Sequence, residues 1–422
     1  MLSSFDDYFI HQTPEPVVIP ATTDRHAYAR FWFNGYSTDG DVFFAISFAR
    51  YPNLGIQDGA LSVVVDGEQH CFFASRRSSA DPAEMQIGPM TLDIIEPMKS
   101  LRVTVDDNET GISADLEWIP RTCSFAEAFQ RTERVPGSST QMVSTRFNQF
   151  GYWSGEINYG SRTVKVTSDR FLGTKDRSWG VRRVGDPAPP GAAPTSTPQI
   201  FFLWTPLQWD DHITHAGVFE DEIGRKWHQD AVILPAYNSP DELPGIEDPG
   251  IETLVDIQHD IDFVPGTRRA RKVELTLGRA SGEKIEIELD CGLVFLMKGI
   301  GYHHPTWGHG KWRGELAIGS ESWRCDEVDA HAVENQHIQS VVTAKQDEMT
   351  GIGVAEQIIL GPHTRYGFNQ FLDFRAFDFI IAVALKKAFS ILRRQAHCAF
   401  KEPLDSFIQW CVVHGRGPAG KT

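Results

Sequence analysis

The stretch F-L-G-T-K-D-R-S-W-G-V-R, Phe171 to Arg182, divides the sequence into two parts. Strand-like runs precede it, and the segment V-G-D-P-A-P-P-G-A-A-P-T-S-T-P follows it. The proline and glycine content of that second segment forbids a regular element and marks a linker. We therefore expect the stretch to be an unusual loop at the end of a first β domain, with Asp176 flanked by Lys175 and Arg177.

Length and composition indicate a folded protein that is too long for a single hydrophobic core of ordinary size. The chain has 422 residues, of which 41% are hydrophobic and 23% are charged. This length predicts two domains or one very large one, and this balance argues against global disorder. The formal charge of −16, without a Lys/Arg-rich block, disfavours a nucleic-acid partner.

The six cysteines form no C-x-x-C pair, and the N-terminus M-L-S-S-F-D-D-Y has neither a basic nor an apolar export region. These features are typical of a cytoplasmic protein with reduced thiols. We also find no run of apolar residues long enough to span a membrane.

Short apolar or alternating runs recur along most of the chain, at a spacing of about ten residues that is typical of β-sandwiches and barrels. The clearest hairpin is V-V-V-D-G-E-Q-H, Val63 to His70, which turns at Asp-Gly. We expect a short helix or a long crossing loop at Ser124 to Arg134. A second series of strands, including Gly310 to Ile318, would complete a second β unit.

The predicted domain plan is an N-terminal arm (1–20), a first β domain (21–184), a linker (185–198), a second β domain (199–372) and a C-terminal helix with a tail (373–422). The last segment changes period, with apolar residues at helical steps: Phe377, Ile380, Ile381, Ala384, Ala388 and Ile391. An amphipathic helix of this kind packs on a barrel or on the partner chain of a homodimer, with a membrane-surface role as the alternative.

Asp176, Trp179 and Arg182 form the first group of candidate site residues. Asp176 is either a general acid or electrostatic group in a dry pocket, or one half of a buried ion pair with Arg177 or Arg182. Trp179 is either a core anchor or a surface for the substrate.

The second candidate group lies in G-I-G-Y-H-H-P-T-W-G-H-G-K-W-R-G-E, Gly299 to Glu315. It offers residues that suit a cavity wall, namely Tyr302, His303, His304, Trp307 and His309. The histidine spacing matches no zinc pattern, so we expect no metal there. A neutral histidine such as His309 would instead bond to a ligand or transfer a proton, or serve the structure alone.

The third candidate group is G-I-G-V-A-E-Q, in which Glu356 interrupts an apolar strand. If Glu356 points inward, it becomes a polar group in an apolar pocket. We add Trp204, at the end of another apolar run, to the expected ligand-binding residues. The sequence has no G-x-S-x-G, P-loop, dinucleotide or H-E-x-x-H motif, which disfavours the common hydrolase and nucleotide-dependent mechanisms.

These groups, in this order and preceded by G-P-M-T-L-D-I-I-E-P-M-K-S-L-R-V, resemble the double-lipocalin (calycin-like) proteins of the AttH and carotenoid 1,2-hydratase type. The resemblance covers roughly residues 31–371. It implies two consecutive lipocalin-like antiparallel β-barrel domains, with ligands in a barrel or at the interface. It also implies reactions of large apolar molecules without metal or redox cofactors. Fungal Diels-Alderases of polyketide pathways look similar in fold.

The resulting hypothesis is a cofactor-independent hydratase, isomerase or cyclase that acts on a terpenoid, steroid or lipid-like substrate. Asp176 and His309 would be catalytic. The substrate-binding residues would be Trp179, Arg182, Trp204, Tyr302, His303, Trp307 and Glu356. The rival hypothesis is a non-catalytic carrier of a hydrophobic molecule, and a metal-dependent enzyme using the three histidines is a weaker third.

Overall fold

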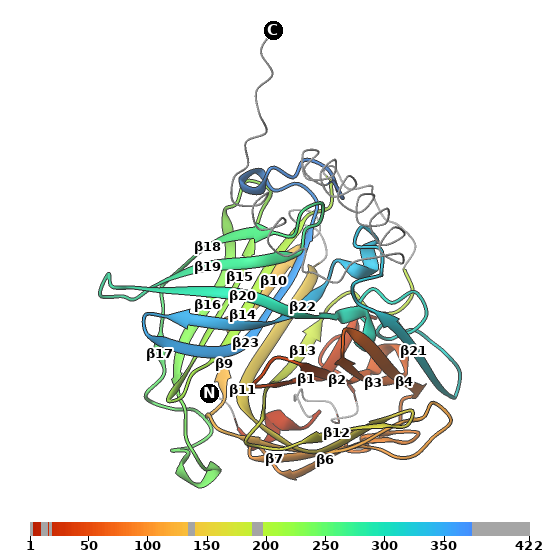
Figure 1. Cartoon of the computed structure of the whole chain (residues 1–422). Helices are drawn as coiled ribbons and strands as arrows, with labels where there is room; N and C mark the ends of the chain where they lie inside the picture. Colours follow the sequence, from red (N-terminus) through yellow and green to blue (C-terminus); the bar gives the residue numbers. More distant parts are fainter. Residues whose placement is uncertain (1–2, 10–15, 17–18, 134–139, 188–196, 374–422) are drawn as a thin grey trace, which may run out of the picture. The chain divides into compact units, whose positions relative to one another are not determined.

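The computed structural model describes residues 3–9, 16, 19–133, 140–187 and 197–373. They belong to one compact unit that ends at Asp373. In this part of the chain the fold is all-β, with two antiparallel barrel-like sheets and short 3-10 helices (Figure 1). The predicted C-terminal helix lies outside the described residues.

The first sheet has 14 strands among the described residues. They are β1 (Ala27–Ser37), β2 (Val42–Tyr51), β3 (Ile56–Val65), β4 (Glu68–Arg77), β5 (Gln86–Ile87), β6 (Met90–Glu96), β7 (Ser100–Val105), β8 (Ile112–Pro120), β9 (Phe125–Ala126), β10 (Gln130–Glu133), β11 (Thr140–Tyr159), β12 (Arg162–Val166), β13 (Phe171–Val181) and β21 (Leu316–Arg324). Their order is β21-β4-β3-β2-β1-β13-β11-β8-β7-β6-β5, and β9, β10 and β12 also pair with β11.

The second sheet has 9 strands, in the order β17-β16-β15-β14-β23-β22-β20-β19-β18. They are β14 (Ile200–Gln208), β15 (His212–Glu220), β16 (Lys226–Pro235), β17 (Glu252–Thr253), β18 (Asp256–Phe263), β19 (Ala270–Gly278), β20 (Lys284–Leu296), β22 (Ile338–Gln346) and β23 (Met349–Leu360). The 3-10 helices are η1 (Ser4–Asp7), η2 (Pro52–Leu54), η3 (Pro240–Glu242), η4 (Met297–Ile300), η5 (Val333–Asn335) and η6 (Thr364–Tyr366).

The stretch that opens the sequence analysis is a strand in the middle of the first sheet, and our prediction of a loop was wrong. β13 pairs with β1 on one side and with β11 on the other. Gly173 permits the close approach of β1, because a Cβ atom there would lie 2.1 Å from the Asn34 carbonyl oxygen. The charged residues of β13 misled the prediction, since isolated charges disfavour a central strand unless each has a partner.

Two further sequence predictions also need correction. Residues 124–134 contain the short strands β9 and β10, which pair with β11, instead of a helix or a crossing loop. Residues 310–315 are irregular, and β21 then pairs with β4 of the first sheet (Figure 1). That strand therefore extends the first sheet instead of completing the second.

Three of the five hydrophobic clusters among the described residues are large. One contains residues of the first sheet such as Phe33 and Trp153, and another contains residues of the second sheet such as Leu207. The third core joins both sheets, with Trp32 from β1 and Trp204 from β14. This shared core surrounds the buried polar groups described next.

Candidate functional site

Successive side chains of β13 point to opposite faces of the first sheet. Lys175 pairs with Asp7, with Nζ 2.5 Å from Oδ1, and both side chains are buried. The Arg177 guanidinium lies over the Phe9 ring, 4.7 Å from its centroid. Because side chains alternate along a strand, Asp176 faces the other way, toward the core shared by the two sheets. Asp176 is thereby separated from Arg177, one of its two predicted partners.

Arg146 of β11 is the cation that pairs with Asp176. Its Nε lies 3.1 Å from Asp176 Oδ2, and its Nη1 lies 3.2 Å from Glu127 Oε2. Burial raises the pKa of Asp176, and although Arg146 lowers it, the pKa remains above its ordinary value. Burial also opposes ionisation of Glu127, but Arg146 and His215 outweigh it and hold the pKa of Glu127 below its ordinary value. The two carboxyl groups that share Arg146 therefore differ in acidity, as expected of groups with different functions.

A series of contacting side chains continues from Asp176 and Arg146 into the core shared by the two sheets. Glu127 Oε1 lies 3.4 Å from His215 Nε2 and accepts a hydrogen bond from Trp204 Nε1 at 3.4 Å. The Trp204 ring packs edge-on against His215 and Trp32, with centroids 5.5 and 5.8 Å away. Trp32 is the register partner of Asp176 on the neighbouring strand β1. We call these residues and Arg146 the buried cluster.

Several polar atoms of the buried cluster have no hydrogen-bond partner among the described residues. They are Asp176 Oδ1, Trp32 Nε1 and Nδ1 of His215, together with Oδ1 of the neighbouring Asn148. Buried polar atoms in folded proteins are almost always paired with protein, water or ligand. Several unpaired buried polar atoms close together therefore mark a candidate position for a polar part of a ligand or for bound water.

Glu356 points inward, as one alternative of the sequence analysis expected. Its Oε1 lies 2.6 Å from His337 Nε2, and Gln339 Nε2 donates to its Oε2 at 2.5 Å. Burial raises the pKa of Glu356, but the bond from His337 outweighs it and the pKa is lowered. Asn34 of β1 donates to Gln339 Oε1 at 3.1 Å, which couples this group to the first sheet.

A cleft of about 850 Å³ opens beside these groups. Its described lining residues are Gln130, Arg131, Thr132, Met142, Arg182, Arg183, Val184, Gly185, Pro198, Gln199, Ile200, Phe219, Trp227, Gly301, Tyr302, His303, His304, Pro305, Gly308, His309, Lys311, Leu360 and Phe371. A volume of this size suits a small organic ligand.

Tyr302 connects the cleft with the buried groups. Its ring packs edge-on against His309 of the cleft and His337 of the Glu356 group, with centroids 4.7 and 4.5 Å away. The guanidinium groups of Arg30 and Arg182 lie 4.9 and 5.4 Å from the same ring. Tyr302 therefore contacts groups of the cleft and also His337 and Arg30.

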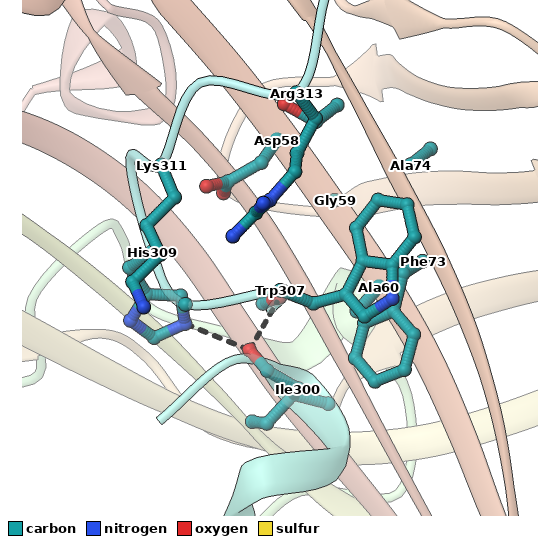
Figure 2. Close-up of a pocket in the computed structure, with 13 residues that line it drawn as sticks. Asp58, Gly59, Ala60, Phe73, Ala74, Ile300, Trp307, His309, Lys311 and Arg313 are labelled. Carbon is teal, nitrogen blue, oxygen red and sulfur yellow. Dashed lines mark hydrogen bonds between the residues drawn. The ribbon is translucent and has the colours of Figure 1, made fainter. Parts of the chain in front are cut away.

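His309 has a defined tautomer and stays neutral. Its Nε2 lies 2.7 Å from the Ile300 carbonyl oxygen, which also accepts a hydrogen bond from Ser47 (Figure 2). Because a carbonyl only accepts, Nε2 carries the proton and Nδ1 keeps a lone pair. Burial, with added repulsion from Arg30 and Arg182, lowers the pKa of His309 well below its ordinary value. His309 is thus neutral and presents the lone pair of Nδ1 as an acceptor.

A second, much smaller cavity of about 10 Å³ is also lined by His309. Figure 2 shows Asp58, Lys311 and Arg313 beside it. Asp58 accepts hydrogen bonds from the Gly310 amide at 2.7 Å and the Tyr51 hydroxyl at 3.1 Å. Burial raises the pKa of Asp58 to about 7 despite these bonds.

The predicted site residues fall into separate places. Arg182, Tyr302, His303 and His309 line the large cleft. Asp176 and Trp204 belong to the buried cluster, and Glu356 lies in the adjacent buried group.

The remaining two residues lie elsewhere. Trp307 stacks on Phe73 at 5.5 Å and lines the small cavity. Trp179 lies on the opposite face of β13 from Asp176, where it lines a separate pocket of about 120 Å³. These two tryptophans therefore do not contribute to the large cleft as the structure describes it.

Sequence reasoning missed Glu127, Arg146, His215 and His337. Arg146 and Asn148 do share a face of β11, and this alternation was visible in T-R-F-N-Q-F. What brings them to Asp176 is the pairing of β11 with β13, which no local pattern encodes.

The three histidines of the 299–315 segment are not grouped as the ligands of a metal ion would be. His304 Nδ1 accepts hydrogen bonds from the Thr306 and Trp307 amides at 3.0 and 2.9 Å, so this atom already has partners. Among the described residues, no three histidine, cysteine, aspartate or glutamate side chains are grouped so that they could hold a metal ion. Within the same ranges, no helix is long and apolar enough to cross a membrane.

Comparison with solved structures finds distant similarities. Kievitone hydratase from Nectria haematococca matches at 12% identity and a TM-score of 0.45, over 78% of this chain and 88% of that chain. CghA matches at 12% identity and a TM-score of 0.45, over 84% of this chain and 97% of that chain. CghA with Sch210972 matches at 12% identity and a TM-score of 0.43, with the same coverage. Similarity this distant assigns no activity to this chain.

A search of the curated proteins gives no match. The model of a protein family, described as a family of unknown function (DUF8625), matches residues 2–369. The resemblance to the AttH and carotenoid 1,2-hydratase proteins therefore stays a prediction. Because the family model covers most of the sequence, this chain belongs to DUF8625.

Proposed function

We propose that this protein is a cofactor-independent enzyme that moves a proton on a hydrophobic small molecule, as a hydratase, isomerase or cyclase. The observation that carries the proposal is the position of Tyr302. Its ring faces the cleft, contacts His309, and has Arg30 on the side of the buried groups. A ligand in the cleft would thus meet the neutral imidazole of His309, and it would contact the same Tyr302 ring that packs against Arg30.

His309 and Asp176 have opposite pKa shifts, which suits a base and an acid. His309 is unprotonated because its pKa is lowered, and it would accept a proton at Nδ1, since Nε2–H is bonded to Ile300. Asp176, whose pKa burial raises, would donate a proton to a ligand that reaches past Tyr302. Alternatively, its charge would stabilise a cation that develops on the ligand, with help from the neighbouring aromatic faces.

The first step of the test is to identify any molecule that co-purifies with the protein. Organic extraction of the purified protein, followed by mass spectrometry, would give its identity and its class. Incubating it with the protein in D₂O should introduce deuterium or a product mass shift. Asp176→Asn and His309→Gln should each lose this activity, while Asp115→Asn, a matched change at an exposed residue of β8, should keep it. Retained activity in both site variants would exclude the proposed roles.

The alternative function is a carrier of a hydrophobic molecule. One observation favours it, because Asp176 is not among the residues that line the cleft and binding alone does not need it. A carrier would release its ligand chemically intact, with no deuterium from D₂O, and Asp176→Asn would lower the melting temperature without changing ligand binding.

A further inference from the structure

The cleft carries a charge opposite to that of the whole chain. Four of its described lining residues are cationic, Arg131, Arg182, Arg183 and Lys311, and none of the described lining residues is acidic. The whole chain has a formal charge of −16. Cations concentrated in one hollow of an acidic protein create a local potential that attracts anions.

Arg182 and Arg183 are not neutralised by any described carboxylate. Arg182 contacts aromatic faces instead, with its guanidinium 5.5 Å from the Tyr28 ring centroid and 5.4 Å from that of Tyr302. A guanidinium group that lies over a ring uses its flat face for this contact, while its N–H groups point outward in the plane. Arg182 is therefore positioned by aromatic rings and retains donors for a ligand.

Lys311 is oriented by backbone carbonyls. Its Nζ donates to the Pro305 oxygen at 2.7 Å and to the His304 oxygen at 3.4 Å. Carbonyl oxygens fix the position of the ammonium group but do not cancel its charge. Lys311 thus adds to the positive potential at the histidine side of the cleft.

Another part of the lining is apolar and aromatic. It contains Ile200, Phe219, Trp227, Leu360 and Phe371. Trp227 is 43% exposed and Phe371 is 37% exposed, which is high for such large side chains. Large aromatic surfaces left open at the edge of a cleft suit the apolar body of a ligand.

We propose that the cleft binds an amphipathic anion. Its apolar body lies against Phe219, Trp227 and Phe371, and its carboxylate or similar anionic group binds Arg182 and Arg183. This inference rests on the proposed function for the place of the ligand, and it narrows the substrate class from any hydrophobic molecule to one with an acidic group. The charged end fixes the orientation of the molecule and so determines which part of it faces Tyr302 and His309.

Two matched pairs of probes test this selectivity: retinoate against retinol, and oleate against oleyl alcohol. Binding is measured by quenching of tryptophan fluorescence and by calorimetry. Each acid should bind at least tenfold more tightly than its alcohol at low salt, and the ratio should fall as salt is added. The double variant Arg182→Gln/Arg183→Gln should bind acid and alcohol about equally. Arg271→Gln, which changes an exposed arginine of β19 paired with Asp262, should leave the preference intact.

The inference is overturned if neither acid binds, if acid and alcohol bind equally to the unchanged protein, or if the double variant keeps the preference. Its failure is distinguishable from failure of the proposed function. Asp176→Asn should keep the preference for acids while it loses proton transfer. Turnover of a neutral ligand without any preference for acids would instead contradict only the inference about charge.

Discussion

The Nε atom of Arg146 lies 3.1 Å from Oδ2 of Asp176, across the neighbouring strands β11 and β13. Both side chains are largely buried, so neither charge is screened by solvent to the extent that surface charges are. The same arginine also contacts Glu127. Arg146 therefore contacts two acidic side chains, Asp176 and Glu127. Its removal should change both the stability of the protein and the pKa of Asp176.

Arg146→Met should lower the free energy of unfolding by about 3–5 kcal/mol, because the buried carboxylate of Glu127 would lose its cation and Asp176 would lose the same partner. Urea unfolding at neutral pH measures the loss. Arg102→Met is the matched control, since Arg102 and its partner Asp115 are each about half exposed; the expected loss is about 1 kcal/mol or less. Equal losses in the two variants would show that Arg146 does not hold buried charge in place.

Glu127→Gln should lower the pKa of Asp176. Burial raises that pKa most, and the negative charge of Glu127 raises it further, whereas Arg146 lowers it. Without the charge of Glu127, Arg146 attracts Asp176 alone. A general acid works only while protonated, so the pH above which turnover falls should move to lower values. Glu117→Gln, at an exposed position of β8, should leave the pH profile unchanged, and an unchanged profile in Glu127→Gln would remove Glu127 from this role.

Gly173→Ala should destabilise the protein by about 1–3 kcal/mol, as overpacking of a close contact does. The new Cβ would lie 2.1 Å from the Asn34 carbonyl oxygen and 2.7 Å from Trp153 Nε1, two atoms that are hydrogen-bonded to each other. Thermal unfolding measures the effect. Gly245→Ala is the control, because the nearest atom to its Cβ would be 3.6 Å away; similar melting temperatures for the two variants would contradict the argument.

The stability of the protein should depend on Asp58 between pH 4 and pH 7. Burial raises the pKa of Asp58 to about 7, while the ordinary pKa of an aspartate is about 3.9. The folded state therefore binds the proton more tightly than the unfolded state, and stability contributed by this group falls as pH rises through that window.

The slope is at most about 1.4 kcal/mol per pH unit, and it is smaller here because the carboxyl is partly exposed. Urea unfolding of the unchanged protein and of Asp58→Asn at pH 5 and pH 7 isolates this contribution. The variant should lose less stability between the two pH values than the unchanged protein. Parallel losses would mean that Asp58 titrates near its ordinary value.

The sequence predicts the strand content better than it predicts the arrangement of the strands. Val63 to His70 forms the expected hairpin of β3 and β4, because an Asp-Gly turn and alternating residues are local signals. β13 was misread as a loop because the residues that stabilise it as a strand are not local in the sequence. The partners that make Lys175 and Asp176 tolerable inside a sheet are Asp7 and Arg146, which are distant in sequence.

Some residues of the candidate site could likewise be predicted from a local pattern, and others could not. Tyr302, His303 and His309 lie in one segment rich in histidine and glycine, and a single pattern pointed to all three. Glu127 and His215 meet only because β9, β11 and β15 bring their neighbourhoods together, so no spacing in the sequence could reveal them. The cationic character of the cleft is likewise a property of the fold, since Arg131, Arg182 and Lys311 come from separate segments.

The pairing of β21 with β4 has a consequence for synthesis of the chain on the ribosome. β4 ends at Arg77 and β21 begins at Leu316, about 240 residues later. At a translation rate of about 5–20 residues per second, this delay is roughly 10–50 s. Throughout it, one side of β4 has unpaired backbone amides and carbonyls next to Phe72 and Phe73, which is the kind of edge that recruits other chains. The nascent protein therefore depends on its own late segment, or on a chaperone, to cover this edge before another molecule does.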